Sequence, residues 1–266
     1  AQYLGMEKVA EIANRTGVME NMPNVLSMAL GAGETSLIDL TAAYASFVNG
    51  GKKVEPSLID RIQDRRGKNI FLENFAACTN CDEPYIEENP MPKLVNSSES
   101  IFDEAKSYQM VSILKGAVDR GTGRKTKIDG IEIAGKTGTT NNNTDAWFIG
   151  FTSDLIIGVY AGFDKPKSLG KRETGSSVAV PIFRDFVKNY YQEKPILPFT
   201  IPNGIELIKI NYDTGEIASN FNSSESVYEA FSKSDNLVSS GEILVGSEGF
   251  QIIEVADEVM EEYVIY

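Results

Sequence analysis

Residues 135–140, with the sequence GKTGTT, constrain the fold of this chain more than any other stretch. The apolar residues 131–134 precede them and predict a strand, and two further apolar runs follow at residues 146–152 and 155–163 after a polar turn. Consecutive strands joined by short turns form an antiparallel meander. The sequence therefore predicts an antiparallel sheet with a lysine, two hydroxyls and a glycine at the end of its first strand.

The residues of this motif have the chemistry of a carboxylate-binding site. Thr137 and Thr139 lie two positions apart, so in a strand both side chains point to the same face. Gly138 between them allows a ligand to approach the backbone closely, and Lys136 adds a cation. The alternative is a strand end whose polar residues face only solvent, and the KTG triplet alone favours this alternative.

Composition excludes several classes of chemistry. The chain has 266 residues, 42% of them hydrophobic, which suits one large or two smaller domains with a buried core. It has no histidine, which excludes Ser-His-Asp and Cys-His catalysis and most zinc sites. We therefore expect neither a metal nor a cofactor, and assign any acid–base chemistry to Lys, Asp, Glu or Tyr.

Charge and hydropathy limit the partners. Of the net charge of −13, residues 191–266 contribute −11, because they hold 14 acidic and 3 basic residues. No basic stripe is present that could neutralise phosphates, so a nucleic acid is not an expected partner. There is no run of about 18 apolar residues and no signal peptide. We expect any membrane anchor to lie in upstream segments.

Both cysteines lie in one short segment, Cys78-Thr-Asn-Cys81. A single Cys-x-x-Cys pair lacks the partners of a structural zinc site. A redox motif would be expected at a strand–helix junction, whereas this pair lies in a Pro- and acid-rich stretch. A local disulfide between Cys78 and Cys81 is favoured over free thiols if the compartment is oxidising.

The spacing of apolar residues predicts helices that begin near Leu4, Thr35, Phe102 and Pro181. Thr35 is the expected N-cap of the second helix, and Pro181 suits the first position of the last helix, which should pack on the sheet. The side chains expected to be buried are Leu37, Leu40, Tyr44, Phe47 and Val48 in the second helix, Tyr108, Val111, Leu114 and Val118 in the third, and Phe183, Phe186, Val187 and Tyr190 in the last.

The remaining stretches are less regular. Residues 54–72 predict a hairpin, and residues 73–100 a long loop or insertion. Residues 205–217 have the pattern strand, turn, strand, with the second strand at Glu216-Ile217. The Ser-, Asn- and Glu-rich composition of residues 221–241 is typical of partial disorder. Residues 252–266 have both helical and strand features, and both assignments stay open.

Several motifs now occur in one order along the chain. They are NGG at 49–51, GTG at 121–123, AGKTGTTN at 134–141, DAWFIGFT at 145–152, GVYAGFD at 158–164, ETG at 173–175 and PIFRDF at 181–186. Together they resemble the transpeptidase domain of class A, bifunctional penicillin-binding proteins over roughly residues 1–190. Residues 201–204 and 212–215 resemble the β-rich extension that follows that domain.

The resemblance implies an α/β fold like that of the serine β-lactamases and penicillin-binding transpeptidases, with an antiparallel sheet packed by helices and a small β-rich C-terminal extension. Accordingly, we assign residues 1–194 to the C-terminal portion of the transpeptidase domain, with 73–100 as a loop or insertion, and residues 195–266 to an acidic β-rich extension or tail.

The resemblance also implies an activity. It is that of an active-site serine D,D-transpeptidase that cross-links peptidoglycan stem peptides ending in D-Ala-D-Ala and is acylated by β-lactam antibiotics. Such an enzyme is held at the inner membrane with its catalytic domain in the periplasm. The third family motif corresponds to Lys136, Thr137, Gly138 and Thr139. The implied roles are positive potential and proton transfer for Lys136, carboxylate binding for the Thr137 and Thr139 hydroxyls, and an oxyanion-hole N–H at Thr139.

The chain departs from the family pattern because neither the S-x-x-K motif nor the S-x-N motif is in place, although both precede the KTG motif in this family. The first residues resemble the helix that follows S-x-N, so we expect a C-terminal part of the domain whose nucleophile lies upstream or on another chain. A milder departure is Ser176, which stands where a second glycine is expected after Gly175.

Short patterns that match the missing motifs occur elsewhere, at residues 112–115, 168–171 and 234–236. Ser112 falls in the middle of a predicted helix, whereas a nucleophile that also donates its N–H to an oxyanion belongs at a helix N-terminus. The other two patterns come after Lys136, which reverses the family order. The isolated chain is therefore expected to be inactive.

Two other functions remain as alternatives. One is a D,D-carboxypeptidase or β-lactamase-like hydrolase, which would use the same site with water as the acceptor. The other is a non-catalytic module that binds a β-lactam or a partner.

Overall fold

The computed structural model describes residues 1–73, 76–79, 93–96, 98–215, 217, 226–233, 242–246, 249–256 and 259–265. The helices are α1 (Met6–Arg15), α2 (Leu37–Val48), α3 (Glu104–Asp119) and α4 (Val180–Tyr190), with the shorter segments η1 (Leu26–Leu30), η2 (Arg124–Thr126), η3 (Asn141–Asn143) and η4 (Gly175–Ala179). The strands are β1 (Arg61–Gln63), β2 (Asn69–Leu72), β3 (Ala76–Thr79), β4 (Lys93–Asn96), β5 (Ala134–Thr139), β6 (Asp145–Phe151), β7 (Ile156–Gly162), β8 (Ile205–Asn211), β9 (Ser226–Ser232), β10 (Glu242–Gly246), β11 (Gly249–Ala256) and β12 (Val259–Ile265).

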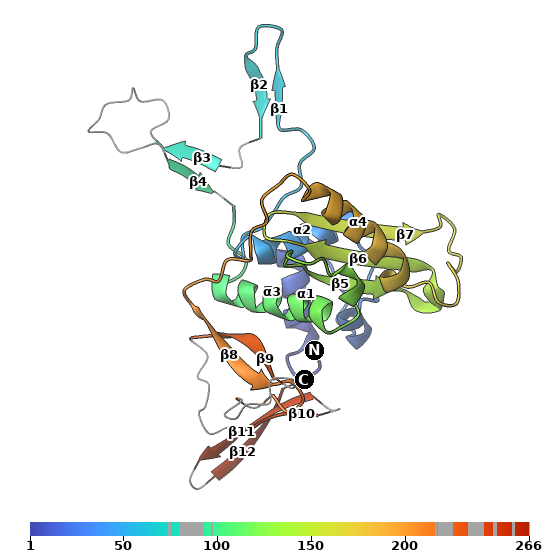
Figure 1. Ribbon diagram of the computed structural model, residues 1–266. Coiled ribbons are helices and arrows are strands. Elements are labelled where there is room, and N and C mark those ends of the chain that lie inside the picture. The colour runs from blue at the N-terminus through green and yellow to red at the C-terminus, as the bar shows by residue number, and fades with distance from the viewer. Residues whose placement is uncertain are drawn as a thin grey trace, which may run out of the picture.

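An antiparallel sheet with the strand order β5-β6-β7 forms the centre of the molecule. On one face α4 covers it, and Phe148 of β6 packs edge-on against Phe183 with the ring centroids 4.9 Å apart. On the other face lie α2 and α3 (Figure 1), where Ala134 and Phe151 are buried together with Val111 of α3. The predicted meander, covered by the helix that begins near Pro181, is confirmed.

The first strand of this sheet begins later than the sequence pattern predicted. Residues 128–131 form a tight turn, in which Gly130 has a φ of 81°. Regular pairing with β6 starts only at Ala134. Residues 136–139 are the last four residues of β5, so the prediction of the motif at the end of the first strand is confirmed, and only the predicted start of that strand at residue 131 is wrong.

The start of α2 also differs from its prediction. Ser36, not Thr35, is the N-cap, and its side chain accepts a hydrogen bond from the Asp39 N–H at 3.1 Å. The hydroxyl of Thr35 instead donates to the Val18 carbonyl at 2.9 Å. Both residues have a hydroxyl that can cap a helix. Because the Thr35 hydroxyl is bonded to Val18, the Ser36 hydroxyl serves as the cap.

The buried face of α2 consists of small residues rather than the large apolar ones that were predicted. Its buried residues are Ala42, Ala43, Ala45 and Ser46, whereas Leu37, Leu40, Tyr44, Phe47 and Val48 are only partly buried. Small side chains let α2 approach the sheet closely. At Gly158 of β7, an added Cβ would lie only 2.1 Å from the Thr41 hydroxyl.

The other two long helices fit their predictions more closely. Val111, Leu114 and Val118 of α3 are buried. Phe183 and Val187 of α4 are fully buried, but Phe186 is 53% exposed, so its predicted burial is wrong. Because Phe186 lies one residue before Val187, it points about 100° away from the sheet-facing side of α4.

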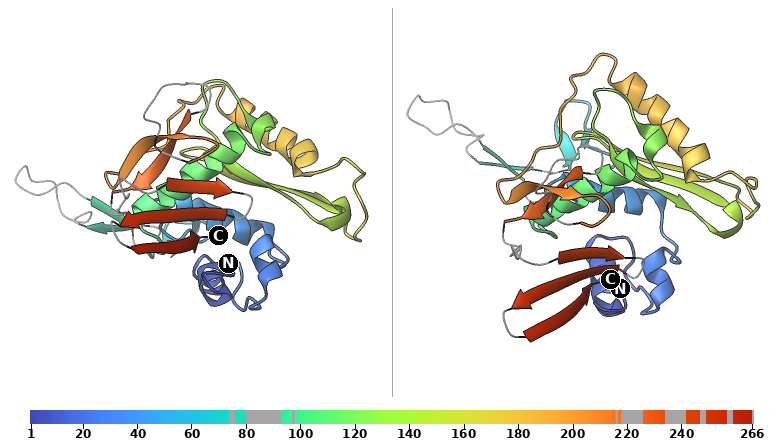
Figure 2. Two further views of the ribbon diagram at one scale, coloured as in Figure 1. Left: turned by 90° about the horizontal axis from the view of Figure 1, so that it is seen from below. Right: turned by 60° about the horizontal axis from the view of Figure 1, so that its bottom comes forward.

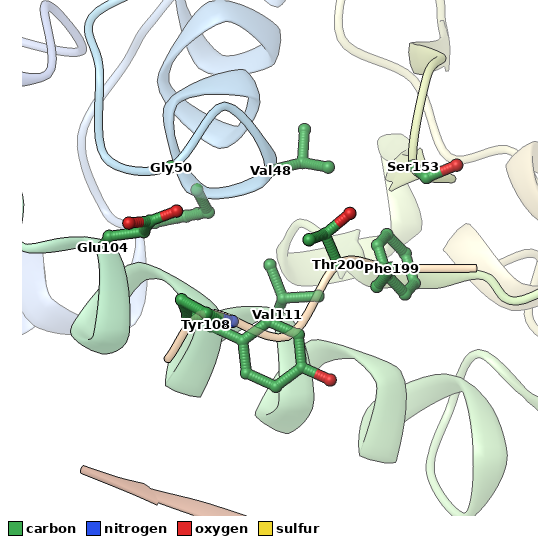
Figure 3. A pocket seen from close by; sticks show the side chains of 10 residues that line it. Val48, Gly50, Glu104, Tyr108, Val111, Ser153, Phe199 and Thr200 are labelled. Atoms are coloured by element: carbon green, nitrogen blue, oxygen red, sulfur yellow. The ribbon is translucent and has the colours of Figure 1, made fainter. Parts of the chain in front are cut away.

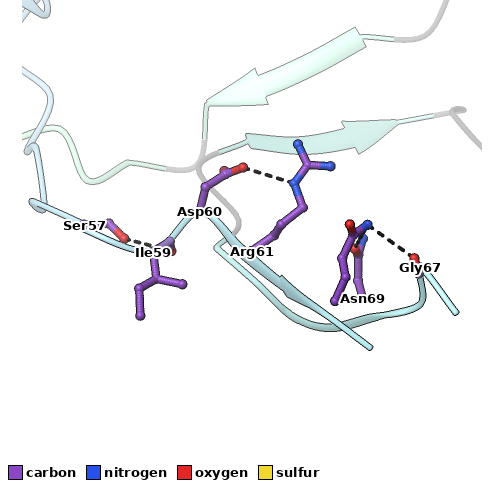
Figure 4. A network of polar contacts seen from close by, with 7 residues as sticks. Ser57, Ile59, Asp60, Arg61, Gly67 and Asn69 are labelled. Carbon is purple, nitrogen blue, oxygen red and sulfur yellow. Dashed lines mark hydrogen bonds and ion pairs between the residues drawn. The ribbon is translucent and has the colours of Figure 1, made fainter. Parts of the chain in front are cut away.

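The predicted hairpin is present as β1 paired with β2, and it projects from the body of the molecule (Figure 1). In its turn, the Gly67 N–H donates to the Asp64 carbonyl at 3.0 Å. Figure 4 shows the contacts beside the turn, where the Gln63 amide donates to the Gly67 carbonyl at 3.2 Å and to the Asn69 side chain at 2.9 Å. These bonds fix the register of the short ribbon.

Within the stretch predicted as a loop or insertion, β3 pairs with β4. Cys78 lies on β3, with its backbone opposite Leu94. Cys81 falls outside the described residues, so the predicted Cys78–Cys81 disulfide stays a prediction.

After α4, β8 pairs with β9 beside α3, where Ala230 of β9 is buried against Ala105. Residues 226–232 are thus a regular strand, and the prediction of partial disorder is wrong for them. The predicted return of the chain to β8 at Glu216-Ile217 is seen at one position, where Ile217 forms an antiparallel bridge to Ile210, and Glu216 falls outside the described residues.

A further sheet has the order β10-β11-β12 and does not join the central sheet (Figure 2). Residues 259–265, and 252–256 before them, therefore adopt the strand assignment of the two left open. None of the helices in the described part of the chain combines the length and apolarity needed to cross a bilayer.

Tyr191, the residue after α4, fastens the end of this helix to the turn between β6 and β7. Its buried hydroxyl lies 2.7 Å from the Thr152 hydroxyl and donates to the Asp154 carboxylate. Burial, together with the hydrogen bond to Asp154, raises the pKa of Tyr191 to about 12. The neutral phenol therefore stabilises the fold below pH of about 10, the unfolded pKa, and this contribution is lost as pH rises towards the folded value.

We expect Tyr191→Phe to lower the free energy of unfolding at pH 7 by about 1–2 kcal/mol, because it removes buried hydrogen bonds but keeps the ring. Urea titration of the chain measures the loss, with Tyr190→Phe at the neighbouring half-buried position as the control. The difference from the unmodified chain should shrink between pH of about 10 and about 12. A difference that stays constant over this range would contradict the assignment.

Candidate active site

The outer edge of β5 has backbone groups that point away from the sheet. The Thr140 N–H donates to the Asp145 carbonyl at 3.2 Å, so these two residues form a hydrogen-bonded pair. Such pairs alternate with non-bonded pairs in an antiparallel ladder, so Thr139, opposite Ala146, belongs to a non-bonded pair. The N–H of Thr139 therefore points away from β6, towards the edge where a ligand oxygen could accept it.

The side chain of Lys136 leaves β5 on the face opposite to that of Thr137 and Thr139, but its ammonium reaches the same outer edge of the strand. Side chains alternate along a strand, so Lys136 and Gly138 share one face and Thr137 and Thr139 share the opposite face. The ammonium of Lys136 donates to the Thr137 carbonyl at 2.9 Å, and that carbonyl points outward because Thr137 is also in a non-bonded pair. The Lys136 side chain is exposed. Its charge thus lies beside the outward-pointing backbone groups.

Each threonine hydroxyl of β5 has one partner from another part of the chain. Thr137 Oγ1 lies 2.7 Å from Thr122 Oγ1, and either hydroxyl can be the donor. Thr139 Oγ1 accepts the N–H of Gly175 at 3.0 Å. Because that bond uses a lone pair of the oxygen, the Thr139 hydroxyl hydrogen stays available to donate to a ligand.

Gly175 can make this bond because it lies against the backbone of the strands. It is buried at the start of η4, a π-helical segment that runs into α4 and is capped by Thr174. A Cβ on Gly175 would lie 2.4 Å from the Trp147 carbonyl oxygen and 2.6 Å from the Gly138 carbonyl oxygen. Only glycine permits this approach, which places η4 at the end of the KTG motif.

The turn after β5 is held by Asp145. Its carboxylate accepts hydrogen bonds from the hydroxyls of Thr140 at 3.0 Å, Thr144 at 3.1 Å and Tyr160 at 2.9 Å. The hydrogen bond to Asp145 raises the pKa of Tyr160. The Tyr160 ring also packs against Trp147, with the centroids 4.9 Å apart. These contacts fix the C-terminal end of β5 relative to β6 and β7.

Sequence reasoning assigned no role to Thr122 or Gly175, although both lie in the motifs GTG at 121–123 and ETG at 173–175. Their contacts with Thr137 and Thr139 span 15 and 36 residues of sequence. Glycine-flanked threonines were the signal that could have directed attention to these positions. The assignment of Lys136, Thr137, Gly138 and Thr139 as site residues stays a prediction.

The S-x-x-K pattern at residues 112–115 does not form a nucleophile–lysine pair. Ser112 lies within α3, and its hydroxyl donates to the Glu229 carboxylate at 3.3 Å. Lys115 is ion-paired with Glu132, just before β5. Burial raises the pKa of Glu132, but hydrogen bonds from Lys115 and from the Phe199 N–H outweigh this and hold the pKa below its usual value.

The other two patterns that match the missing motifs are at residues 168–171 and 234–236. Ser168 is in an irregular segment, where its hydroxyl accepts the Gly170 N–H at 3.2 Å. The pattern at residues 234–236 falls outside the described residues. In the part of the chain that is described, no group of three or more His, Cys, Asp or Glu side chains is arranged to hold a metal ion.

A separate cavity of about 110 Å³ lies between α2, α3 and the segment after α4. Figure 3 shows Glu104 and Tyr108 of α3 beside Phe199 and Thr200 of that segment. Its lining contains no residue of β5. The cavity is thus distinct from the KTG edge.

Residues 5–188 match the family model described as the penicillin binding protein transpeptidase domain. Penicillin-binding protein 1A of Rickettsia conorii is 44% identical over 223 residues, which cover 82% of this chain and 28% of that protein. Penicillin-binding protein 1A of Pseudomonas aeruginosa is 31% identical over 277 residues, which cover 92% of this chain and 34% of that protein. The chain thus spans about a third of the length of these curated relatives.

Solved structures of penicillin-binding proteins also resemble this chain. The crystal structure of penicillin-binding protein 1A from Haemophilus influenzae has a TM-score of 0.71 and 28% identity, and the match covers 88% of this chain and 37% of that chain. PonA1 from Mycobacterium tuberculosis, in complex with penicillin V, has a TM-score of 0.58 at 19% identity, and the match covers 73% of this chain and 54% of that chain. The latter likeness shows the fold alone.

The chain belongs to the penicillin-binding protein transpeptidase domain family. It has the α/β fold of these domains, and the relatives reported above include proteins named penicillin-binding protein 1A.

We expect Gly175→Ala to lower the free energy of unfolding by about 1–3 kcal/mol, because the added methyl overlaps backbone atoms that cannot move aside. Urea titration measures the loss, and amide NMR shifts of Gly138 and Thr139 report displacement of β5. Ser176→Ala, at the next and partly buried position, is the matched control. Equal stability of the two variants would show that η4 is not held against β5 as described.

Proposed function

We propose that this chain supplies the KTG-bearing part of a D,D-transpeptidase that cross-links peptidoglycan, in a protein whose nucleophilic serine lies outside this chain. Membership of the family supports the reaction class. The observation that carries the proposal is the open edge of β5, with the outward N–H of Thr139 beside two hydroxyls and an ammonium. The substrates are stem peptides ending in D-Ala-D-Ala, and β-lactams bind in their place.

Each group at the edge has a role in this reaction. The hydroxyls of Thr137 and Thr139 and the ammonium of Lys136 bind the terminal carboxylate of the peptide or the β-lactam. The N–H of Thr139 donates to the carbonyl oxygen under attack and stabilises the negative charge that develops there. The serine forms an acyl-enzyme as the terminal D-alanine leaves, and an amine of a second peptide then takes the acyl group.

Lys136 keeps its charge available for these roles. Among the described residues no carboxylate forms an ion pair with it; its ammonium is held only by the neutral carbonyl of Thr137. An ammonium that is not neutralised raises the local positive potential and attracts an anionic substrate.

The proposed reaction also indicates where in the cell the protein acts. Peptidoglycan lies outside the cytoplasm, so we infer an envelope protein held at the inner membrane, with this domain in the periplasm and its anchor in segments outside this chain. The division into residues 1–194 and 195–266 belongs to the same proposal, as does the Cys78–Cys81 disulfide, which requires an oxidising compartment.

In the complete protein, we expect Thr139→Val to slow acylation by penicillin roughly 10- to 100-fold, since a hydrogen bond to a charged group contributes about 1.5–3 kcal/mol. Lys136→Ala should slow it further because it removes a charge. Stopped-flow acylation with a fluorescent penicillin measures the rates.

Thr139→Ser is the matched control, because it keeps the oxygen that accepts the Gly175 N–H and the hydrogen that the ligand accepts. It should retain most of the acylation rate. If Thr139→Val acylates as fast as Thr139→Ser, the hydroxyl does not bind the carboxylate.

This chain alone is expected not to be acylated. The Ser112 hydroxyl donates to Glu229 and Lys115 is ion-paired with Glu132, which supports this expectation because a nucleophile and its base must contact each other. Incubation of the 266-residue chain with fluorescent penicillin, followed by peptide mapping, tests this. Stoichiometric label on Ser112 would show that the chain is an enzyme in its own right.

A further inference from the structure

Four cations gather on one side of the molecule, where η2 meets the first turns of α4. Arg124, Lys125 and Lys127 come from the η2 segment and Arg184 from α4. Together with Pro181 and Asp185 they line a depression of about 350 Å³. We call it the η2–α4 basic depression. The positive charge of this depression is opposite in sign to the net charge of the whole chain, which is −13.

Most of these cations are not neutralised by the protein. Lys127 lies 3.5 Å from the Asp119 carboxylate. Among the described residues, Arg124, Lys125 and Arg184 form no ion pair. Single surface cations are ordinary, but like charges that face one hollow repel each other, and an anion bound between them removes that repulsion.

Both walls of the depression begin at residues that touch β5. Thr122, which contacts the Thr137 hydroxyl, stands two positions before Arg124. On the other side, Gly175 donates to Thr139, and η4 runs from there directly into α4, which presents Arg184. The depression is therefore joined at both walls to the edge that holds the motif.

We propose that the η2–α4 basic depression binds an anionic group of the substrate that lies beyond the part held by β5. This inference rests on the proposed function. The ligand chemistry is an anion with at least two negative charges, either a phosphate or a pair of neighbouring carboxylates, because two arginines offer planar, bidentate donors. Neighbouring carboxylates of a peptide and a phosphate on a glycan or its lipid-linked precursor are the two sources with this chemistry.

The depression can be tested on this chain without any acylation. Inorganic pyrophosphate and γ-glutamylglutamate, which has three carboxylates, are titrated at low salt while ¹H–¹⁵N NMR shifts are recorded. We expect shifts at residues 124–127 and 180–185, which weaken as salt rises because the contacts are exposed charges. Tighter binding of one probe identifies phosphate or carboxylate as the source.

Variants separate a site from general attraction. Arg124→Gln with Arg184→Gln should weaken binding of the preferred probe roughly 10-fold, at about threefold to fivefold for each exposed charge. Asp185→Asn should instead tighten it by a few fold, because it removes the acid that lines the hollow. Arg65→Gln with Arg66→Gln, in the β1–β2 turn, removes the same charge and should leave the affinity unchanged.

Three results would overturn the inference: no shifts at residues 124–127, equal affinity in both double variants, or weaker binding by Asp185→Asn. A second experiment, in the complete protein, tests whether the depression has a role in the reaction. There, Arg124→Gln with Arg184→Gln should lower cross-linking of polymeric substrate but leave acylation by penicillin unchanged. Equal loss of both would contradict a separate subsite. Absence of any penicillin acylation in the unmodified protein would instead refute the proposed function. The probe titrations would still show whether the depression binds an anion.

Discussion

The burial of both faces of the central sheet holds the rest of the structure in place. β5 contributes little to this burial, because of its six residues only Ala134 is a buried apolar side chain. Its position therefore depends on backbone pairing with β6, whose Phe148 and Phe151 are fully buried on opposite faces. A buried phenylalanine contributes roughly 1.5–3 kcal/mol. The motif strand can thus be polar and open at its edge because its neighbour supplies the apolar contacts.

Close backbone approach is the second constraint. Gly175 lets η4 lie against β5, so that its main-chain N–H orients the Thr139 hydroxyl. On the same edge, the Thr122 hydroxyl orients that of Thr137. Hydroxyls that are already hydrogen-bonded lose less freedom when a ligand binds, which favours binding of a carboxylate in one orientation.

The distribution of charge fits this arrangement. Residues 191–266 carry most of the negative charge, and residues 1–190 are close to neutral. Lys136 in the motif and Arg124 and Arg184 in the η2–α4 basic depression therefore lie in a part of the chain that has few surplus acids to neutralise them. Acidic groups such as Glu132 and Glu229 are paired instead with Lys115 and Arg120 of α3. Among the described residues, Lys136, Arg124 and Arg184 are thus left without an ion-pair partner.

The sequence by itself determined the meander, the helix that follows it, the β1–β2 hairpin and the family, because periodicity, turn residues and motif order are properties of short stretches. It also singled out Lys136, Thr137 and Thr139. Only the tertiary structure decided that β5 starts at Ala134, that β8 pairs with β9, and that Thr122 and Gly175 contact the motif. Those outcomes depend on packing between segments far apart in sequence, such as the 36 residues between Thr139 and Gly175, and no local pattern encodes which of them will meet.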